Sequence, residues 1–174
     1  MAGKLQHELR KRQPFERAEE EAFLSILRTA DVLNRAVLEM FRPFDLSPTQ
    51  YNVLRILRGT CPTGSHGLPC SAIADQMLTR DPDMTRLLDR LEKRGLISRA
   101  REERDRRVVR TCITQKGIDI LKELDPVVSG GNRKYLGSMS QEQCKQLIEL
   151  LELAREHVTS QDQSVATTAT PTSA

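Results

Sequence analysis

The sequence predicts a mainly α-helical fold with a small β-wing, of the winged helix-turn-helix class. Apolar residues recur at three- and four-residue spacing in several segments, as they do in amphipathic helices. Within residues 79–117, a helix pattern is followed by two short alternating patterns around a charged turn, and then by another helix start. Together with a short helix just before it, this order predicts a helix-turn-helix with a wing.

The composition indicates a single folding unit. The chain has 174 residues, of which 38% are hydrophobic and 29% are charged. Because it has no run of about 18 apolar residues and no apolar signal core after Met1, we expect a cytoplasmic protein without a membrane partner. The four cysteines are widely spread, which favours reduced thiols over a disulfide framework.

No motif of a catalytic or cofactor site is found. The sequence has no glycine-rich phosphate loop, no nucleophile motif and no histidine pair at metal-binding spacing. We therefore expect neither an enzyme nor a bound cofactor or metal.

The N-terminal part is predicted as a basic arm followed by two helices. Residues 1–15 are polar and basic and should be flexible. The segment from Glu16 to about Phe41 has an acidic start and the stripe of a long amphipathic helix. Ser47 and Gln50 form a capping box for a mostly buried helix from Pro48 to about Leu57. The stripe of the first helix consists of Phe23, Ile26, Leu27, Ala30, Leu33, Val37, Met40 and Phe41.

The middle of the chain supplies the helix-turn-helix. Gly59–Pro69 is rich in helix breakers and is predicted as a loop, with a short helix around Cys70–Met77 after it. Asp81 and Pro82 are the predicted N-cap and first turn of the next helix. Its inward face holds Met84, Leu87, Leu88 and Leu91, and its polar, mainly basic face holds Pro82, Thr85, Arg86, Asp89, Arg90 and Lys93.

The wing is predicted from a terminating glycine and two alternating segments. Gly95 ends the helix, and Leu96–Arg101 and Arg107–Ile113 are strand candidates. Residues 102–106 are too polar to be buried and should form the exposed tip of the hairpin. Residues of the second strand that should alternate toward the core are Val109, Thr111 and Ile113.

Two further helices and a tail complete the chain. Thr114 is a predicted cap for a helix to about Leu124, and Ser140 with Gln143 forms a capping box for the last helix. The low-complexity tail, residues 159–174, is expected to be disordered. The stripe of the last helix consists of Cys144, Leu147, Ile148, Leu151, Ala154 and Val158.

Positive charge is concentrated in one segment. Arg80 to Lys116 contains 12 Lys and Arg against 7 Asp and Glu, whereas the rest of the chain contains 15 against 17. Such a patch is expected of a nucleic-acid binder, because cations neutralise phosphates. Charge alone does not separate this interpretation from a solvated charged face.

Three motifs then occur in a fixed order: LSPTQYNVL at 46–54, MTRLLDRLEKRGLI at 84–97 and DRRVVRTCITQKG at 105–117. The third follows a wing pattern D-x-R…(L/I)-T-x-x-G. Through these motifs the chain, from about Ala22 to Val158, resembles the MarR family of dimeric winged helix-turn-helix transcriptional regulators.

The resemblance implies an intertwined helical homodimer that binds a pseudo-palindromic operator in double-stranded DNA. Residues 16–45 and 118–158 would form the dimerisation helices, and 46–117 the DNA-binding lobe. The unpaired apolar stripes at both ends independently need a partner. The family further implies a repressor released by a small, often aromatic, effector held between the dimerisation helices and the lobe, although no motif marks that pocket.

The helix from Pro82 to Arg94 matches the family's recognition helix, which lies in the major groove. Arg86 or Arg90 would fork onto guanine O6 and N7, while Thr85 and Lys93 suit phosphate oxygens equally well. One departure is the acidic entry Arg80-Asp81-Pro82-Asp83, where many members have a small polar run. We interpret its two acids as helix caps, which leaves the base-reading register open.

In the wing pattern, Arg107 matches the arginine that enters the minor groove. Asp105 would hold it in place, and Arg104 and Arg106 would contact phosphates. An ordinary hairpin ion pair between Asp105 and Arg107 is compatible with this role. A winged-helix adaptor that binds protein instead of DNA is an alternative, but it would not need these arginines.

Two cysteines leave a second alternative open. Cys61 and Cys70 flank the predicted loop with His66 between them, whereas the family's usual sensor position near the start of the first helix holds no cysteine. Ordinary thiols are the favoured interpretation. A thiol-based redox regulator using Cys61 and Cys70 is the alternative, and zinc would need more ligands than these three.

Overall fold

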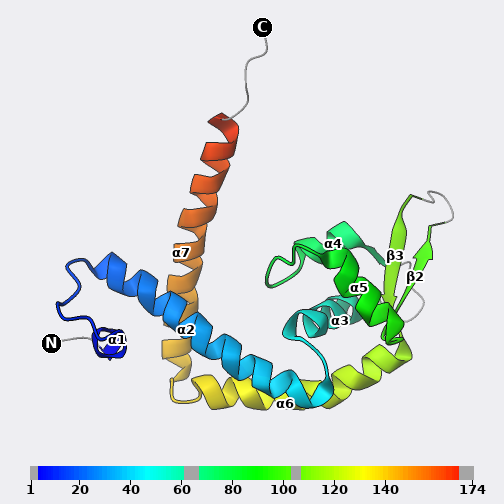
Figure 1. Ribbon diagram of the computed structural model, residues 1–174, viewed down its shortest axis with the longest axis horizontal. Helices are drawn as coiled ribbons and strands as arrows, with labels where there is room; N and C mark the ends of the chain where they lie inside the picture. The colour runs from blue at the N-terminus through cyan, green and yellow to red at the C-terminus, as the bar shows by residue number, and fades with distance from the viewer. Residues whose placement is uncertain (1–3, 61–66, 103–106, 169–174) are drawn as a thin grey trace, which may run out of the picture. The chain divides into compact units, whose positions relative to one another are not determined.

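The computed structural model describes residues 4–60, 67–102 and 107–168, with side chains as far as 157. The described residues form helices and one small antiparallel sheet (Figure 1). The chain divides into two compact units, residues 1–131 and 132–174, where the composition had indicated a single folding unit. The mainly helical fold with a β-wing is therefore as predicted. No helix within these residues is long and apolar enough to cross a membrane.

A short helix that the sequence did not predict lies in the N-terminal arm. Helix α1 (Lys4–Glu8) buries Leu5 and precedes the long helix α2 (Ala18–Phe41). Ion pairs between the arm and α2 join Glu8 to Arg28 at 3.4 Å and Lys11 to Glu20 at 3.3 Å. The segment predicted as a flexible arm thus has structure of its own.

The apolar stripe of α2 is used differently at its two ends. Phe41 is buried in the core, with Val37 and Met40 packed against it. Near the start of the helix, Phe23 and Leu27 are exposed by 62% and 52%. The C-terminal end of α2 therefore belongs to the core of this chain, whereas its N-terminal half leaves apolar surface uncovered.

Helix α3 (Pro48–Thr60) follows a short 3₁₀ helix, η1 (Arg42–Phe44), and begins at the predicted capping box. The Ser47 backbone N–H donates to Gln50 Oε1 at 3.0 Å, and the Gln50 N–H donates to Ser47 Oγ at 3.1 Å. These two bonds satisfy backbone donors that a helix start leaves unpaired.

The sheet has the strand order β1-β3-β2. Its strands are β1 (Leu68–Pro69), β2 (Ile97–Arg101) and β3 (Val109–Ile113). The two-residue strand β1 was not predicted, because it lies inside a segment of breakers and forms only by pairing with β3. The predicted inward position of Val109 is wrong: this first residue of β3 is 40% exposed, and it pairs with Arg101, the last residue of β2.

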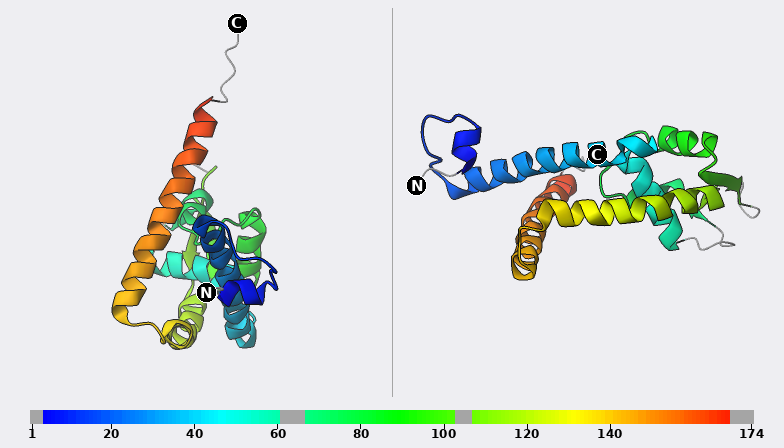
Figure 2. Two further views of the ribbon diagram at one scale, coloured as in Figure 1. Left: turned by 90° about the vertical axis from the view of Figure 1, so that its left-hand side faces the viewer. Right: turned by 90° about the horizontal axis from the view of Figure 1, so that it is seen from below.

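Helices α4 (Cys70–Asp75) and α5 (Met84–Lys93) form the helix-turn-helix with the turn between them. Figure 1 shows α3, α4 and α5 grouped beside the β2–β3 hairpin, and Figure 2 shows the same group from two other directions. The fully buried side chains of this lobe include Val53, Leu54, Leu57, Ile73, Leu91 and Leu121.

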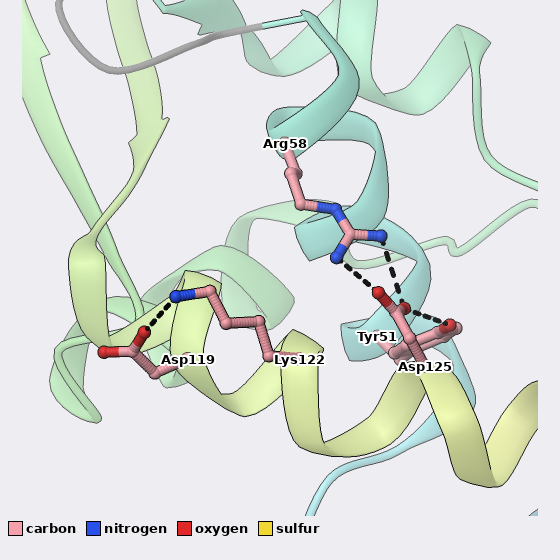
Figure 3. Close-up of polar contacts among 5 residues, drawn as sticks. All are labelled: Tyr51, Arg58, Asp119, Lys122 and Asp125. Atoms are coloured by element: carbon pink, nitrogen blue, oxygen red, sulfur yellow. Dashed lines mark hydrogen bonds and ion pairs between the residues drawn. The ribbon is translucent and has the colours of Figure 1, made fainter.

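Helix α6 (Gln115–Leu136) continues well beyond its predicted end at Leu124. Pro126 lies inside the helix and ordinarily would break it. The helix persists because tertiary contacts hold it on the N-terminal side of the proline: Leu124 is fully buried and Asp125 is bound by Arg58 of α3 (Figure 3).

The second unit contains helix α7 (Gln141–Thr168), which begins at the predicted capping box of Ser140 and Gln143. The disordered tail expected from residue 159 is helical as far as Thr168. No glycine or proline interrupts this stretch before Pro171, so no residue forces the helix to end.

Candidate nucleic-acid interface

The outer face of α5 is exposed and basic, whereas its inner face is apolar and buried. Met84, Leu87, Leu88 and Leu91 are buried, as the helical wheel predicted. The opposite face presents the exposed residues Thr85, Arg86, Arg90 and Lys93. Because the apolar face is packed against the core along its length, the helix that carries these cations is firmly held in the lobe.

The entry to α5 differs from the prediction. The N-cap is Asp83 rather than Asp81, and its carboxylate accepts the Arg86 backbone N–H at 3.2 Å. Asp81 instead accepts the Asp83 N–H at 2.9 Å, which makes a local turn that delays the helix start. Asp83 also pairs with the Arg86 guanidinium at 3.1 Å. Both acids therefore act in capping and turn formation, as the favoured interpretation of the acidic entry expected.

The far end of α5 is fixed by a glycine motif and by a lysine. Gly95 has φ of +70°, and the Leu96 N–H donates to the Leu91 carbonyl at 3.0 Å. Lys116, at the start of α6, donates to the Arg94 carbonyl at 2.9 Å. A cation at this point also suits the negative end of the helix dipole.

A side chain of the wing forms ion pairs with one edge of α5. Arg99 of β2 donates to Glu92 Oε2 through Nε at 2.8 Å and Nη2 at 2.6 Å, and to Asp89 Oδ1 at 2.5 Å. The hydrogen bonds that Arg99 donates to Glu92 are the largest cause of a raised pKa for the Arg99 guanidinium. We call these three residues the wing clamp.

The base of the wing has its own ion pair. Arg110 of β3 donates to Glu102 Oε2 at 3.1 Å and 3.0 Å, and reaches the Gly67 carbonyl at 3.4 Å. These contacts join both strands of the hairpin to the segment that leads into β1.

The predicted wing residues are only partly described. Arg107 is exposed in the turn that leads into β3. Arg104, Asp105 and Arg106 lie outside the described residues, so the positioning role of Asp105 stays a prediction.

The predicted redox pair is likewise only half described. Cys61 lies outside the described residues with His66, whereas Cys70 is half-buried at the first position of α4. Among the residues that the structure describes, no three histidine, cysteine, aspartate or glutamate side chains gather as a metal site would require.

A hollow of about 650 Å³ adjoins the first turns of α5. Its wall combines the end of α2, η1, the start of α3 and the basic face of α5. The lining residues are Leu38, Arg42, Asp45, Leu46, Ser47, Pro48, Thr49, Gln50, Asp81, Asp83, Arg86, Leu87 and Arg90.

Two residues of the site, Asn52 and Arg99, were not predicted from the sequence. The Asn52 side chain accepts the Leu78 N–H at 2.7 Å and so fixes the turn between α4 and α5. Arg99 was predicted only as part of a strand, and its partners lie on another element. An acidic pair three residues apart on a basic helix was the one available signal that a cation must face it.

Known proteins are similar to this chain in sequence and fold. The model of the MarR family matches residues 46–109. A MarR transcription factor from Planctomyces limnophilus is 39% identical, with 80% of this chain and 98% of that chain covered and a TM-score of 0.62. The S. aureus MepR–DNA complex is 21% identical with a TM-score of 0.67, covering 78% of this chain and 96% of that one. An organohalide-sensing regulator bound to 2,4-dichlorophenol is 19% identical with a TM-score of 0.72, covering 84% and 87%.

Proposed function

Because this chain belongs to the MarR family of transcription regulators, we propose that it binds an operator in double-stranded DNA as a homodimer and represses transcription until a small effector releases it. The observation that carries the proposal is the exposed basic face of α5 on a buried apolar base. The exposed face of such a helix can enter the major groove while its apolar face stays packed in the lobe.

The proposed contacts divide into two groups. In the major groove, Arg86 and Arg90 read guanine edges, and Thr85 and Lys93 bind phosphates or bases. In the wing, Arg107 enters the minor groove, Asp105 orients it, and Arg104 and Arg106 bind phosphates.

Homodimer formation is supported by apolar surface on the helices at both ends of the chain. On α2, Phe23, Ile26 and Leu27 are exposed. On α7, Ile148, Leu150 and Leu153 are exposed as well. Patches of this kind on an extended helix need a cover, and a symmetric second copy provides one.

Effector control is supported by the hollow beside α5. Two proposed DNA contacts, Arg86 and Arg90, line it together with Arg42. A small aromatic or phenolic ligand in this hollow would contact these arginines and compete with DNA for them. Binding of ligand and of DNA would then oppose each other, as linkage requires of an inducer.

The test is selection of a DNA duplex from a random-sequence library by the purified protein, followed by affinity measurements on that duplex. Arg90→Ala should weaken binding about 5- to 150-fold, since a bidentate base contact contributes roughly 1–3 kcal/mol. Lys11→Ala, which removes a cation of the N-terminal arm that pairs with Glu20 at 3.3 Å, is the control and should bind as the unaltered protein does. Failure of the unaltered protein to enrich any sequence would contradict the proposal.

A further inference from the structure

Helix α5 carries opposing charges on its solvent side. Its sequence, MTRLLDRLEK, contains three basic and two acidic residues. On a helical wheel, Glu92 and Asp89 occupy one edge of the polar face, next to the edge that holds Lys93, Arg86 and Arg90. A helix meant for phosphate thus has two carboxylates beside its cations, and these would repel DNA if left unpaired.

The wing clamp meets both carboxylates with one side chain. Arg99 contacts Glu92 and Asp89 at 2.5–2.8 Å, and its own side chain is only 23% exposed. A planar guanidinium can serve two carboxylates at once, which an ammonium does less well. The cation that balances the acidic edge of α5 therefore comes from β2.

Without Arg99, the carboxylates would have other partners within reach. Asp89 stands four residues before Lys93, a spacing at which helical side chains meet. An unclamped Asp89 could pair with Lys93 and draw it away from DNA.

We propose that Arg99 is a positioning residue for DNA binding, which neutralises Asp89 and Glu92 and so keeps the cations of α5 available to phosphate. Arg99 acts through these carboxylates rather than by its own contact with DNA. The inference rests on the proposed DNA-binding function and adds a residue to it that no recognition motif contains.

The test uses Arg99→Gln on the duplex that the unaltered protein selects from a random-sequence library, with affinity measured by fluorescence anisotropy over a range of salt concentrations. We expect about tenfold weaker binding. The slope of log affinity against log salt concentration should fall by about one, because Lys93 then pairs with Asp89 instead of a phosphate. The affinity of Arg99→Lys should lie between that of Arg99→Gln and that of the unaltered protein. Lys11→Gln removes one cation from an ion pair with Glu20 at 3.3 Å in the N-terminal arm and should leave affinity unchanged.

The deciding measurement is rescue. In a variant that combines Arg99→Gln with Asp89→Asn and Glu92→Gln, no unpaired carboxylate remains, so affinity should return to within about threefold of the unaltered protein. If this triple variant binds as weakly as Arg99→Gln, Arg99 serves DNA binding only by holding the wing or by touching DNA, and the inference is overturned. Equal affinity of Arg99→Gln and the unaltered protein overturns it as well. Absence of any selected duplex would instead overturn the proposed function itself, and this inference with it.

Discussion

Arg58 of α3 and Asp125 of α6 form a two-pronged ion pair, with Nη1 to Oδ2 at 2.6 Å and Nη2 to Oδ1 at 3.2 Å (Figure 3). The Tyr51 hydroxyl donates to Asp125 Oδ1 at 3.3 Å. Hydrogen bonding from Arg58 is the main cause of a lowered pKa for the Asp125 carboxyl, and burial raises the pKa of Tyr51. Because Pro126 follows directly, this pair holds α6 to the lobe at the point where its helical hydrogen bonding is interrupted.

Asp125→Asn should therefore lower the free energy of unfolding by about 1 kcal/mol at pH 7, the value of a partly exposed pair. The lowered pKa means that the carboxylate stabilises the fold above about pH 4 and that this contribution is lost as the pH falls through the folded-state pKa. Urea unfolding at pH 7 and at pH 3 should show the gap between variant and unaltered protein shrinking in acid. Glu123→Gln, at an exposed residue of the same helix, is the control and should leave the free energy of unfolding unchanged. An equal gap between Asp125→Asn and the unaltered protein at both pH values would refute the assignment.

Gly117→Ala should destabilise the lobe by about 2 kcal/mol, as overpacking does. A Cβ there would lie 2.7 Å from Ile113 Cγ1 and even closer to the Leu96 carbonyl oxygen, which is backbone and cannot easily move. Gly59→Ala, in α3 with nothing within 4 Å of the added carbon, should be neutral or stabilising by up to about 0.5 kcal/mol. The midpoints of urea unfolding of the two variants measure this difference in stability. Equal midpoints would contradict the close approach of Gly117 to Ile113 and the Leu96 carbonyl oxygen.

Arg107→Ala should weaken binding to the selected duplex about tenfold and reduce the salt slope by about one. The reason is the loss of a cation from the minor groove, where the negative potential is enhanced. Titrations by anisotropy at several salt concentrations measure both quantities, with Lys11→Ala as the control. Unchanged affinity together with an unchanged slope would remove Arg107 from the DNA interface.

Leu27→Asp should convert the proposed dimer to monomer at micromolar concentration. It places a charge in the exposed apolar half of α2, and burying an unpaired carboxylate at an interface is costly. Sedimentation velocity measures the result. Leu78→Asp makes the same substitution at a residue 88% exposed in the turn before α5, and it should leave the dimer intact. A stable monomer of the unaltered protein would contradict dimerisation.

Local patterns predicted much of this structure. Both capping boxes, the buried face of α5 and the terminating role of Gly95 were predictable because each depends on residues within a few positions of one another. The predictions failed where distant segments meet. β1 exists only through its pairing with β3, and α6 passes Pro126 while its preceding turn is packed and bound to α3.

By itself, the sequence determined the order of the main helices and of the two strands of the wing, the separation of α5 into an apolar and a basic face, and the motifs shared with the MarR family. Only the tertiary structure decided that β1 forms by pairing with β3, and that Arg99 of β2 balances Asp89 and Glu92. The physical reason is range: helix periodicity and capping act over three or four residues, whereas ion pairs between elements depend on how the chain packs.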